Sequence, residues 1–529
     1  MQTRPEPLPP WLAAAMVFLA SGAVLVLEIV GLRLVGPYVG VTLQTSSAVI
    51  GVALAAIAYG AWLGGWLADR YPPRHLLAPA LVLAAVTTAV TLPVVRYAGE
   101  ILRGSAAAGV LLLTVLATFV PCALLSTVPP LVVKLQLGDL GQTGRVVGRL
   151  SSIGTLGAIT ATLGTGFVLV AALPSSVIVL TLAVLLGAAG LALGWHLRRP
   201  APAGLPGPAR RTGPAGRTRA VVAVAGLAGA GLVAVAPDPC DVETAYHCAR
   251  VVADPARPTG RLLVLNSARH SYVDLADPRH LEFEYVQWIG ALADVLAPPA
   301  RPLAALHLGG GGFTLPRYLA ATRPGGSNVV LELDGELVEL DRAELGLRDF
   351  PGLRVEVGDA RVGLAGEAAG AYDLAVGDAF GHLVVPWHLA TRELVTDVRR
   401  VLRPAGCYAL NVIDYPPGRF VRAEVATVAA VFPYVALVAP ESAVNGGSGA
   451  NFVILGSAAP LPLAALRDRL AARAADAAAS GGDPAAPGDP AERVEPVRVL
   501  AGAELAAFVG GARVLTDDHA PVDQLLARP

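Results

Sequence analysis

The stretch LHLGGGGFTLPRYLAA, residues 306–321, indicates the fold of the C-terminal half of this 529-residue chain. A short apolar run ends in four glycines, and a helix-like stretch follows them. Because glycine has no side chain, its backbone N–H groups can approach a ligand closely at the start of a helix. This order is typical of a nucleotide site, although turns of other kinds also use glycine.

The segments around this stretch alternate between short β-rich runs and helical patterns. The expected strands are 303–308, 327–333, 353–358, 372–378, 407–413, 434–439 and 451–456, and the expected helices are 315–321, 336–345, 389–402 and 418–431. This alternation predicts a doubly wound α/β domain, Rossmann-like and of the methyltransferase type, over 301–529. A small antiparallel β-subdomain is expected before it, over 238–300, and a flexible low-complexity insert near 470–495.

Polar residues follow four of the predicted strands, where ligands sit in such sheets. Gly309, Gly310 and Gly311 follow the first strand, and Glu332 and Asp334 close the second, suited to ribose hydroxyls. Asp359 follows the third strand, suited to an adenine amine, and Asp378 follows the fourth, over the expected reacting centre. The set predicts a nucleoside site, and the alternative is that these acids only cap helices.

The N-terminal half has the composition of a membrane domain. Mean hydropathy of the chain is +0.58. Six apolar runs are each long enough to cross about 30 Å of hydrocarbon; they lie near 11–35, 45–68, 76–98, 106–133, 147–171 and 174–196. The sequence therefore predicts six spans within 1–197, a basic Pro/Gly linker at 198–220, and a seventh candidate span at 221–237.

Charge divides the chain at the same place. Residues 1–237 hold 15 Lys and Arg against 5 Asp and Glu, a net of +10, which leaves 25 against 36, a net of −11, for the rest. The acidic second half argues against nucleic acid as a partner, and the expected partners are the lipid bilayer and a small-molecule substrate. Self-association into a homo-oligomer is left open.

Basic loops suggest the orientation of a multi-pass protein of the cell membrane. The loops 69–75 and 134–149 and the linker would share the cytoplasmic face. If 221–237 crosses, the C-terminal half faces outward, and Cys240 and Cys248 stand where a disulfide is permitted. If it only lies against the membrane, that half stays in the cytoplasm. Within the first span, Glu28 and Arg33 are interpreted as a helix contact and an interface-seeking side chain, rather than parts of a transport path.

Several motifs resemble those of the polyamine aminopropyltransferases, the spermidine synthases. ETAYHCARV (243–251) is similar to an opening strand motif, and HSYVDLADPRHLEFEYVQW (270–288) to the segment that carries a substrate-contacting tyrosine, here Tyr285. Four motifs resemble the nucleoside site of this family. LGGGG is similar to its cofactor loop, and LELDGELVEL to the strand that carries the ribose acid, here Glu332. GDA (358–360) is similar to the motif of the adenine-side acid, here Asp359, and YDLAVGDAF to the strand that carries the catalytic aspartate, here Asp378. DAFGHLVVPWHLATREL and LTDDHAPVDQLL are similar to a membrane-fused branch of this family. GGWLADRYPPR (64–74) resembles a loop of major facilitator transporters, of which this chain would be half at most.

The resemblance implies transfer of an aminopropyl or other alkyl group from decarboxylated S-adenosylmethionine, or S-adenosylmethionine, to an unidentified acceptor. Asp378 would be the general base that takes a proton from an amine of pKa near ~10.4. The alternative is a non-catalytic ligand-binding or transport-linked protein with a degenerate domain. A methyltransferase is a third reading and would need a pocket for the cofactor's carboxylate.

The chain departs from the family where an amine should be held. Gly312 stands where the family usually has aspartate, and an acid that normally follows the catalytic one is missing after Asp378. His270 and Gln287 replace a glutamine and a glutamate. A partly buried ammonium without its carboxylate loses about 1.5–3 kcal/mol. These departures argue against a polyamine substrate.

Four further residues have open roles. His270 and His388 are candidates for substrate contact or acid–base work, and each is otherwise structural. Asp517 and Asp518 either fold back onto the site or begin a last turn. No Cys/His spacing suggests a metal site.

Overall fold

The structure is a computed structural model that describes residues 8–103, 107–137, 140–198, 238–381, 384–479 and 495–526. The chain forms two compact units, Met1–Cys248 and Ala249–Pro529. The first unit includes residues 238–248, eleven residues that were expected to begin the small β-subdomain.

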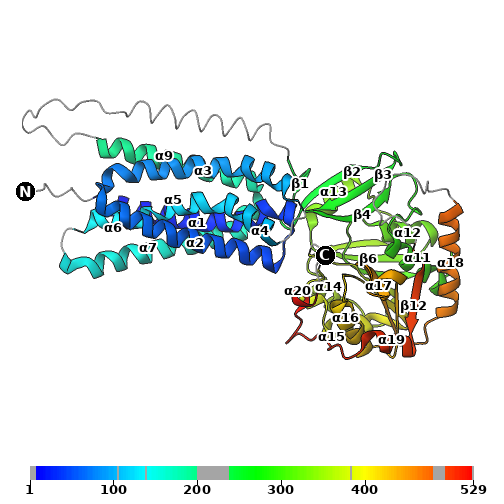
Figure 1. Cartoon of the computed structure of the whole chain (residues 1–529). Helices are drawn as coiled ribbons and strands as arrows, with labels where there is room; N and C mark the ends of the chain where they lie inside the picture. Colours follow the sequence, from blue (N-terminus) through cyan, green and yellow to red (C-terminus); the bar gives the residue numbers. More distant parts are fainter. Residues whose placement is uncertain are drawn as a thin grey trace, which may run out of the picture. The chain divides into compact units, whose positions relative to one another are not determined.

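Unit 1 contains six long apolar helices that lie side by side (Figure 1). They are α1 (Pro10–Val39), α2 (Leu43–Arg70), α3 (Pro73–Ile101), a fourth helix formed by α4 (Ala107–Thr114), a π-helical turn (Val115–Phe119), α5 (Val120–Ser126) and α6 (Val128–Gln136), a fifth formed by α7 (Thr143–Gly164), a π-helical turn (Thr165–Leu169) and α8 (Val170–Ala172), and α9 (Ser175–Arg198). Each is long and apolar enough to cross a membrane. The predicted six spans agree with these helices to within a few residues, and the seventh candidate at 221–237 lies outside the described residues.

Small residues allow these helices to approach closely. A side chain at Gly60 or Gly64 would collide with the backbone of Ala123 or Thr127, and one at Gly157 with the backbone of Phe18. Such contacts are how apolar helices pack when water supplies no driving force between them.

Residues 238–248 belong to unit 1. This segment holds the two-residue strand β1 (Val242–Glu243) and a disulfide between Cys240 and Cys248, whose Cα atoms are 5.1 Å apart. Arg33 of α1 donates to the Glu243 carboxylate at 2.9 Å and to the carbonyl of Ala245 at 2.7 Å. Arg33, interpreted from the sequence as an interface-seeking side chain, has its guanidinium bound by this segment.

Unit 2 begins with a small antiparallel arrangement of β2 (Cys248–Ala253), β3 (Gly260–Leu265) and β4 (Ala268–Asp274), followed by α11 (Glu284–Leu296). Its main sheet has eight strands in the order β12-β10-β11-β9-β8-β5-β6-β7. They are β5 (Ala304–Leu308), β6 (Ser327–Glu332), β7 (Leu353–Val357), β8 (Tyr372–Gly377), β9 (Leu402–Asp414), β10 (Tyr434–Pro440), β11 (Ala450–Ser457) and β12 (Val497–Ala501). Strands β5 to β9 are mutually parallel and the remaining pairs antiparallel, and the strand order reverses between β5 and β8. The doubly wound prediction is confirmed, and β12 was not anticipated.

Helices cover both faces of this sheet. One face packs against α11, α12 (Thr314–Thr322), α13 (Gly335–Glu344) and α18 (Leu463–Ala479). The other packs against α14 (Ala360–Gly366), α15 (Arg392–Val401), α16 (Arg419–Ala429), α19 (Gly502–Val509) and α20 (Val522–Leu525). The short α17 (Glu441–Val444) follows β10. Buried aliphatic side chains from alternate strand positions fill both layers, as the two-residue period of a strand requires.

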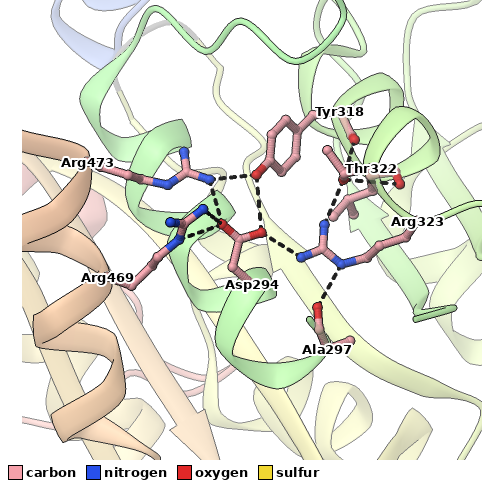
Figure 2. A network of polar contacts seen from close by, with 8 residues as sticks. Asp294, Ala297, Tyr318, Thr322, Arg323, Arg469 and Arg473 are labelled. Carbon is pink, nitrogen blue, oxygen red and sulfur yellow. Dashed lines mark hydrogen bonds and ion pairs between the residues drawn. The ribbon is translucent and has the colours of Figure 1, made fainter. Parts of the chain in front are cut away.

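α18 corrects the expected position of the flexible insert. Residues 470–479 continue this helix, and the rest of the expected insert, 480–494, lies outside the described residues. Figure 2 shows the reason: Arg469 and Arg473 of α18 converge on Asp294 of α11, at 2.7 and 2.9 Å. Buried Arg323 donates to the other oxygen of Asp294 at 2.7 Å. The alanine-rich composition suggested low complexity, whereas two arginines one turn apart lie on the same face of the helix and both pair with Asp294.

Candidate functional site

The glycine turn after β5 requires two of its glycines for geometric reasons. Gly309 has a φ of +98°, and a side chain there would meet the carbonyl oxygen of Asp378 at 2.4 Å. Gly311 has a φ of +49° and lies against the Ser271 hydroxyl. The Asp378 amide donates to the carbonyl of Leu308 at 2.9 Å. The turn and Asp378 are therefore adjacent, at the point where the strand order reverses, which is the ligand position of open α/β sheets.

Asp378 is a partly buried carboxylate with two neutral donors. Tyr285 of α11 donates to one oxygen at 3.0 Å, and Asn411 of β9 donates to the other at 2.8 Å. Burial raises the pKa of Asp378 to about 6, and the two donors oppose that rise. A carboxyl group that loses its proton near neutral pH is suited to general base catalysis.

A cavity of about 30 Å³ lies beside Asp378 and has room for about two water molecules. Its lining is mostly aromatic and aliphatic: Ser271, Tyr272, Phe283, Tyr285, Val286, Ile289, His307, Gly309, Gly310, Thr314, Leu315, Pro316, Val376 and Asp378. Of the candidates from the sequence, this cavity brings together Gly309, Gly310, Tyr285 and Asp378.

Glu332, Asp334 and Asp359 are held by the protein's own main chain. Glu332 accepts from the amides of Gly310 and Asp334, at 2.7 and 2.9 Å. Asp334 caps α13, and Asp359 caps α14 through the amides of residues 361 and 362. Helix capping, the alternative weighed for these acids, is therefore present at Asp334 and Asp359. A capping carboxylate keeps a second oxygen for other contacts, so capping and ligand binding are compatible.

The second oxygen of Asp359 contacts His388, whose Nε2 lies 2.9 Å away. Partial burial raises the pKa of Asp359, but the helix amides and His388 lower it more, so it stands below its usual range. His388 thus belongs to the Asp359 end of the site rather than to the cavity beside Asp378. Arg361 extends this group by pairing with Asp517 at 2.5 Å. The C-terminal segment therefore returns to this edge of the sheet, as one of the two readings of Asp517 expected.

The space beside Gly312 is occupied. A side chain at this position would meet the Cβ of Ser271 at 3.0 Å and a methyl of Val273 at 3.1 Å. The Gly312 amide itself donates to the Ser271 hydroxyl at 3.0 Å. Residues of β4 thus fill the place where an aspartate of the resembling family would stand.

His270 and Gln287 lie near the cavity without lining it. The His270 ring packs edge-on against Phe380, with centroids 6.4 Å apart, next to the glycine turn. Gln287 donates to the carbonyls of Leu281 and Glu282, at 2.8 and 3.2 Å. Its amide therefore holds the start of α11 together.

Three polar residues of the site were not anticipated: Asn411, Asn451 and His307. Asn411 bonds Asp378 and in turn accepts from Asn451 at 3.0 Å. His307 lines the cavity, and burial lowers its pKa to about 4 against the opposing bond to Asn328. A polar residue inside an apolar strand was the available signal for each. The described residues hold no group of three His, Cys, Asp or Glu side chains placed for a metal ion.

Comparison with known proteins places these residues in context. No family profile matches the chain. The chain is 31% identical over 145 residues to the polyamine aminopropyltransferase of Vibrio vulnificus (strain CMCP6), a match that covers 27% of this chain and 47% of that protein. The chain thus spans about half the length of this curated relative.

Solved structures give two further likenesses. A probable spermidine synthase from Corynebacterium glutamicum ATCC 13032 has a TM-score of 0.45 and 26% identity, covering 54% of this chain and 96% of that one. A spermidine synthase in complex with the transition state analogue AdoDATO has a TM-score of 0.34 and 15% identity, covering 42% and 73%. The sequence match and the strand-end motifs together identify the chain as spermidine-synthase-like in part of its length.

Proposed function

We propose that unit 2 binds an S-adenosylmethionine-type nucleoside, either S-adenosylmethionine or its decarboxylated form, and transfers an alkyl group to an acceptor amine. Aminopropyl is one such group. The six helices of unit 1 would hold the protein in a lipid bilayer as a multi-pass membrane protein. The small-molecule acceptor and the bilayer are the partners in this proposal, and nucleic acid is not.

Asp378 is the observation on which the proposal depends. It is partly buried, its desolvation raises its pKa to about 6, and it adjoins a glycine turn at the reversal of strand order. An alkylammonium is mostly protonated at neutral pH and cannot attack. Asp378 would take that proton as the amine nitrogen bonds to the carbon beside the sulfonium. The carbon–sulfur bond breaks in the same step, and its electron pair leaves with the thioether nucleoside.

The lining of the cavity favours an acceptor with a single amine. Asp378 is the one acid among the lining residues described. A diamine would leave its second ammonium in the cavity without a paired carboxylate, which is unfavourable. Ser271 and Val273 lie beside Gly312, where the resembling family has an aspartate. An amine on the transferred group would therefore also lack that carboxylate.

Ligand-dependent thermal unfolding of the full-length protein in detergent tests the nucleoside site. Methylthioadenosine, S-adenosylmethionine and decarboxylated S-adenosylmethionine would each be added. A ligand at 100 times its Kd should add about 2.7 kcal/mol of stability. Glu332→Gln should abolish the shift, whereas Glu339→Ala, an exposed acid on α13, should retain it.

The outcome separates the transferase from a binding role. Stabilisation together with turnover that Asp378→Asn removes would support transfer. A second candidate function, ligand binding linked to the membrane unit, is favoured by one observation: Glu332 already accepts from the amides of the glycine turn. Stabilisation without turnover of any amine would support that role. No shift with any of the three nucleosides would refute both.

A further inference from the structure

We infer that residues 238–248, and with them the whole of unit 2, lie on the non-cytoplasmic side of the membrane. The inference rests on unit 1 and holds whether or not the proposed function is correct.

Successive long helices joined by short connections run antiparallel, so the bundle has two ends. α1 ends at Val39 and α2 begins at Leu43, whereas α2 ends at Arg70 and α3 begins at Pro73. We name these the Val39 end and the Arg70 end. By the same alternation, α9 begins with Ser175 at the Val39 end. It finishes with Arg198 at the Arg70 end, about 36 Å away at 1.5 Å per residue.

Residues 238–248 are fastened to the Val39 end. Glu243 accepts from the amide of Ser175, the first residue of α9, at 3.0 Å, and pairs with Arg33 in the last third of α1. Asp238 pairs with Arg96, near the end of α3, at 3.3 Å. Three helices therefore hold the segment at one end, and the Arg33–Glu243 pair is largely shielded, with 17% and 19% of the side chains exposed.

The chain thus leaves α9 at the Arg70 end and returns at Asp238 at the Val39 end. Arg198 and Asp238 flank the 39 residues between them, and these two residues lie on opposite sides of a membrane that the six helices span. A crossing within 221–237, one of the two alternatives left open by the sequence, would connect these end points. The six candidate spans all precede residue 198, and none lies in the described residues after 238. Unit 2 therefore stays on the side where residues 238–248 are.

Two observations orient the bundle. The helix ends and connections at the Arg70 end carry Arg70, Arg74, Lys134, Arg145 and Arg149, and six more arginines follow between 198 and 219. Those at the Val39 end carry fewer basic residues, Arg33, Arg96 and Arg103. Positive charge in short loops marks the cytoplasmic face. The Cys240–Cys248 disulfide lies at the Val39 end, and such bonds persist in oxidising compartments.

The location of unit 2 determines how a nucleoside can reach its site. S-adenosylmethionine is made in the cytoplasm, so a nucleoside that reaches this site must first cross the membrane. A transport step for a nucleoside therefore precedes the proposed transfer, and the acceptor is one present on the outer side.

Cysteine labelling of the full-length protein in intact cells tests the inference. Native Cys122 and Cys407 are buried and the other pair is bonded, so wild type should not react with a membrane-impermeant maleimide. Three variants are compared: His75→Cys at the Arg70 end of α3, Ile101→Cys at its Val39 end, and Asp349→Cys in unit 2. Ile101 is 84% exposed, and the Asp349 side chain is 89% exposed.

Ile101→Cys and Asp349→Cys should label in intact cells to the level seen after permeabilisation. His75→Cys should label only after permeabilisation, and a membrane-impermeant reductant should expose Cys240 and Cys248 in intact cells. Labelling of Asp349→Cys that requires permeabilisation would overturn the inference. Labelling of His75→Cys in intact cells would overturn it equally, because the orientation would then be reversed. Neither result depends on a nucleoside or on turnover, so the test is separate from that of the proposed function.

Discussion

At the scale of single residues, the site depends on how Asp378 is kept partly protonated. Its partly buried carboxyl group lies beside aromatic and aliphatic side chains, and among the residues that the structure describes its hydrogen-bond donors are the neutral Tyr285 and Asn411. An adjacent arginine would have lowered the pKa far below neutrality, and the group would then have been a poor base. The absence of such a cation among its bonded partners is what makes Asp378 suited to accept a proton.

The pH dependence of transfer follows from that arrangement. The proposed base acts in its ionised form, so kcat/KM for the proposed transfer should fall as pH decreases through about 6. Asp378→Asn should lower kcat by roughly 10²–10⁴. Tyr285→Phe removes a donor to the charged form and should move the acidic limb to higher pH. Asp373→Asn, at the other end of β8, is the matched control; if it shifts the limb equally, the assignment to Asp378 is wrong.

At the scale of elements, a network of charges fastens α18 to the sheet domain. Asp294 lies between buried Arg323 and the two arginines of α18 (Figure 2). Burial raises its pKa, but the arginines lower it more, so the pKa stands below its usual range. A depressed folded-state pKa contributes stability that is present above the unfolded pKa and is lost as pH falls through the folded value.

Substitution of Asp294 should therefore lower the free energy of unfolding strongly. Asp294→Ala leaves buried Arg323 without its carboxylate and should destabilise the protein by about 3–5 kcal/mol. Arg469→Ala removes a 41% exposed partner and should cost at most about 1 kcal/mol. Thermal unfolding in detergent measures both. Equal losses in the two variants would contradict a central role for Asp294.

At the scale of the whole molecule, polar contacts hold residues 238–248 against the apolar helices of unit 1. Glu243 binds Arg33 and Ser175, which are 210 and 68 residues away in sequence. The paired charges lie among apolar helices, where an unpaired charge is costly. This pairing keeps the disulfide-linked segment at one end of the bundle.

Loss of Glu243 should loosen that segment. Glu243→Ala removes charge-assisted bonds worth about 1.5–3 kcal/mol, so the opened state should rise at least tenfold and reduction of the Cys240–Cys248 bond should accelerate accordingly. Asp238→Ala breaks a pair whose carboxylate is 66% exposed and should change the rate less than about fivefold. Gel-shift kinetics with a mild reductant measure the difference. Similar rates in both variants would show that Glu243 does not hold the segment.

Local patterns in the amino-acid sequence determined much of the architecture. Apolar runs long enough to span a bilayer predicted all six long helices of unit 1. Alternating strand and helix patterns placed Gly309, Glu332 and Asp378 at strand ends, where the structure has them. These features depend on residues close together in sequence, and hydrophobic periodicity records such relations directly.

Only the tertiary structure decided which distant residues meet. Asn411 reaches Asp378 because β9 lies beside β8, and Ser271 and Val273 fill the space beside Gly312 because β4 packs there. Arg33 meets Glu243, and α18 continues through 470–479 because Asp294 holds its arginines. Such pairs depend on strand order and packing between segments far apart in the chain, and no periodicity within either segment specifies its partner.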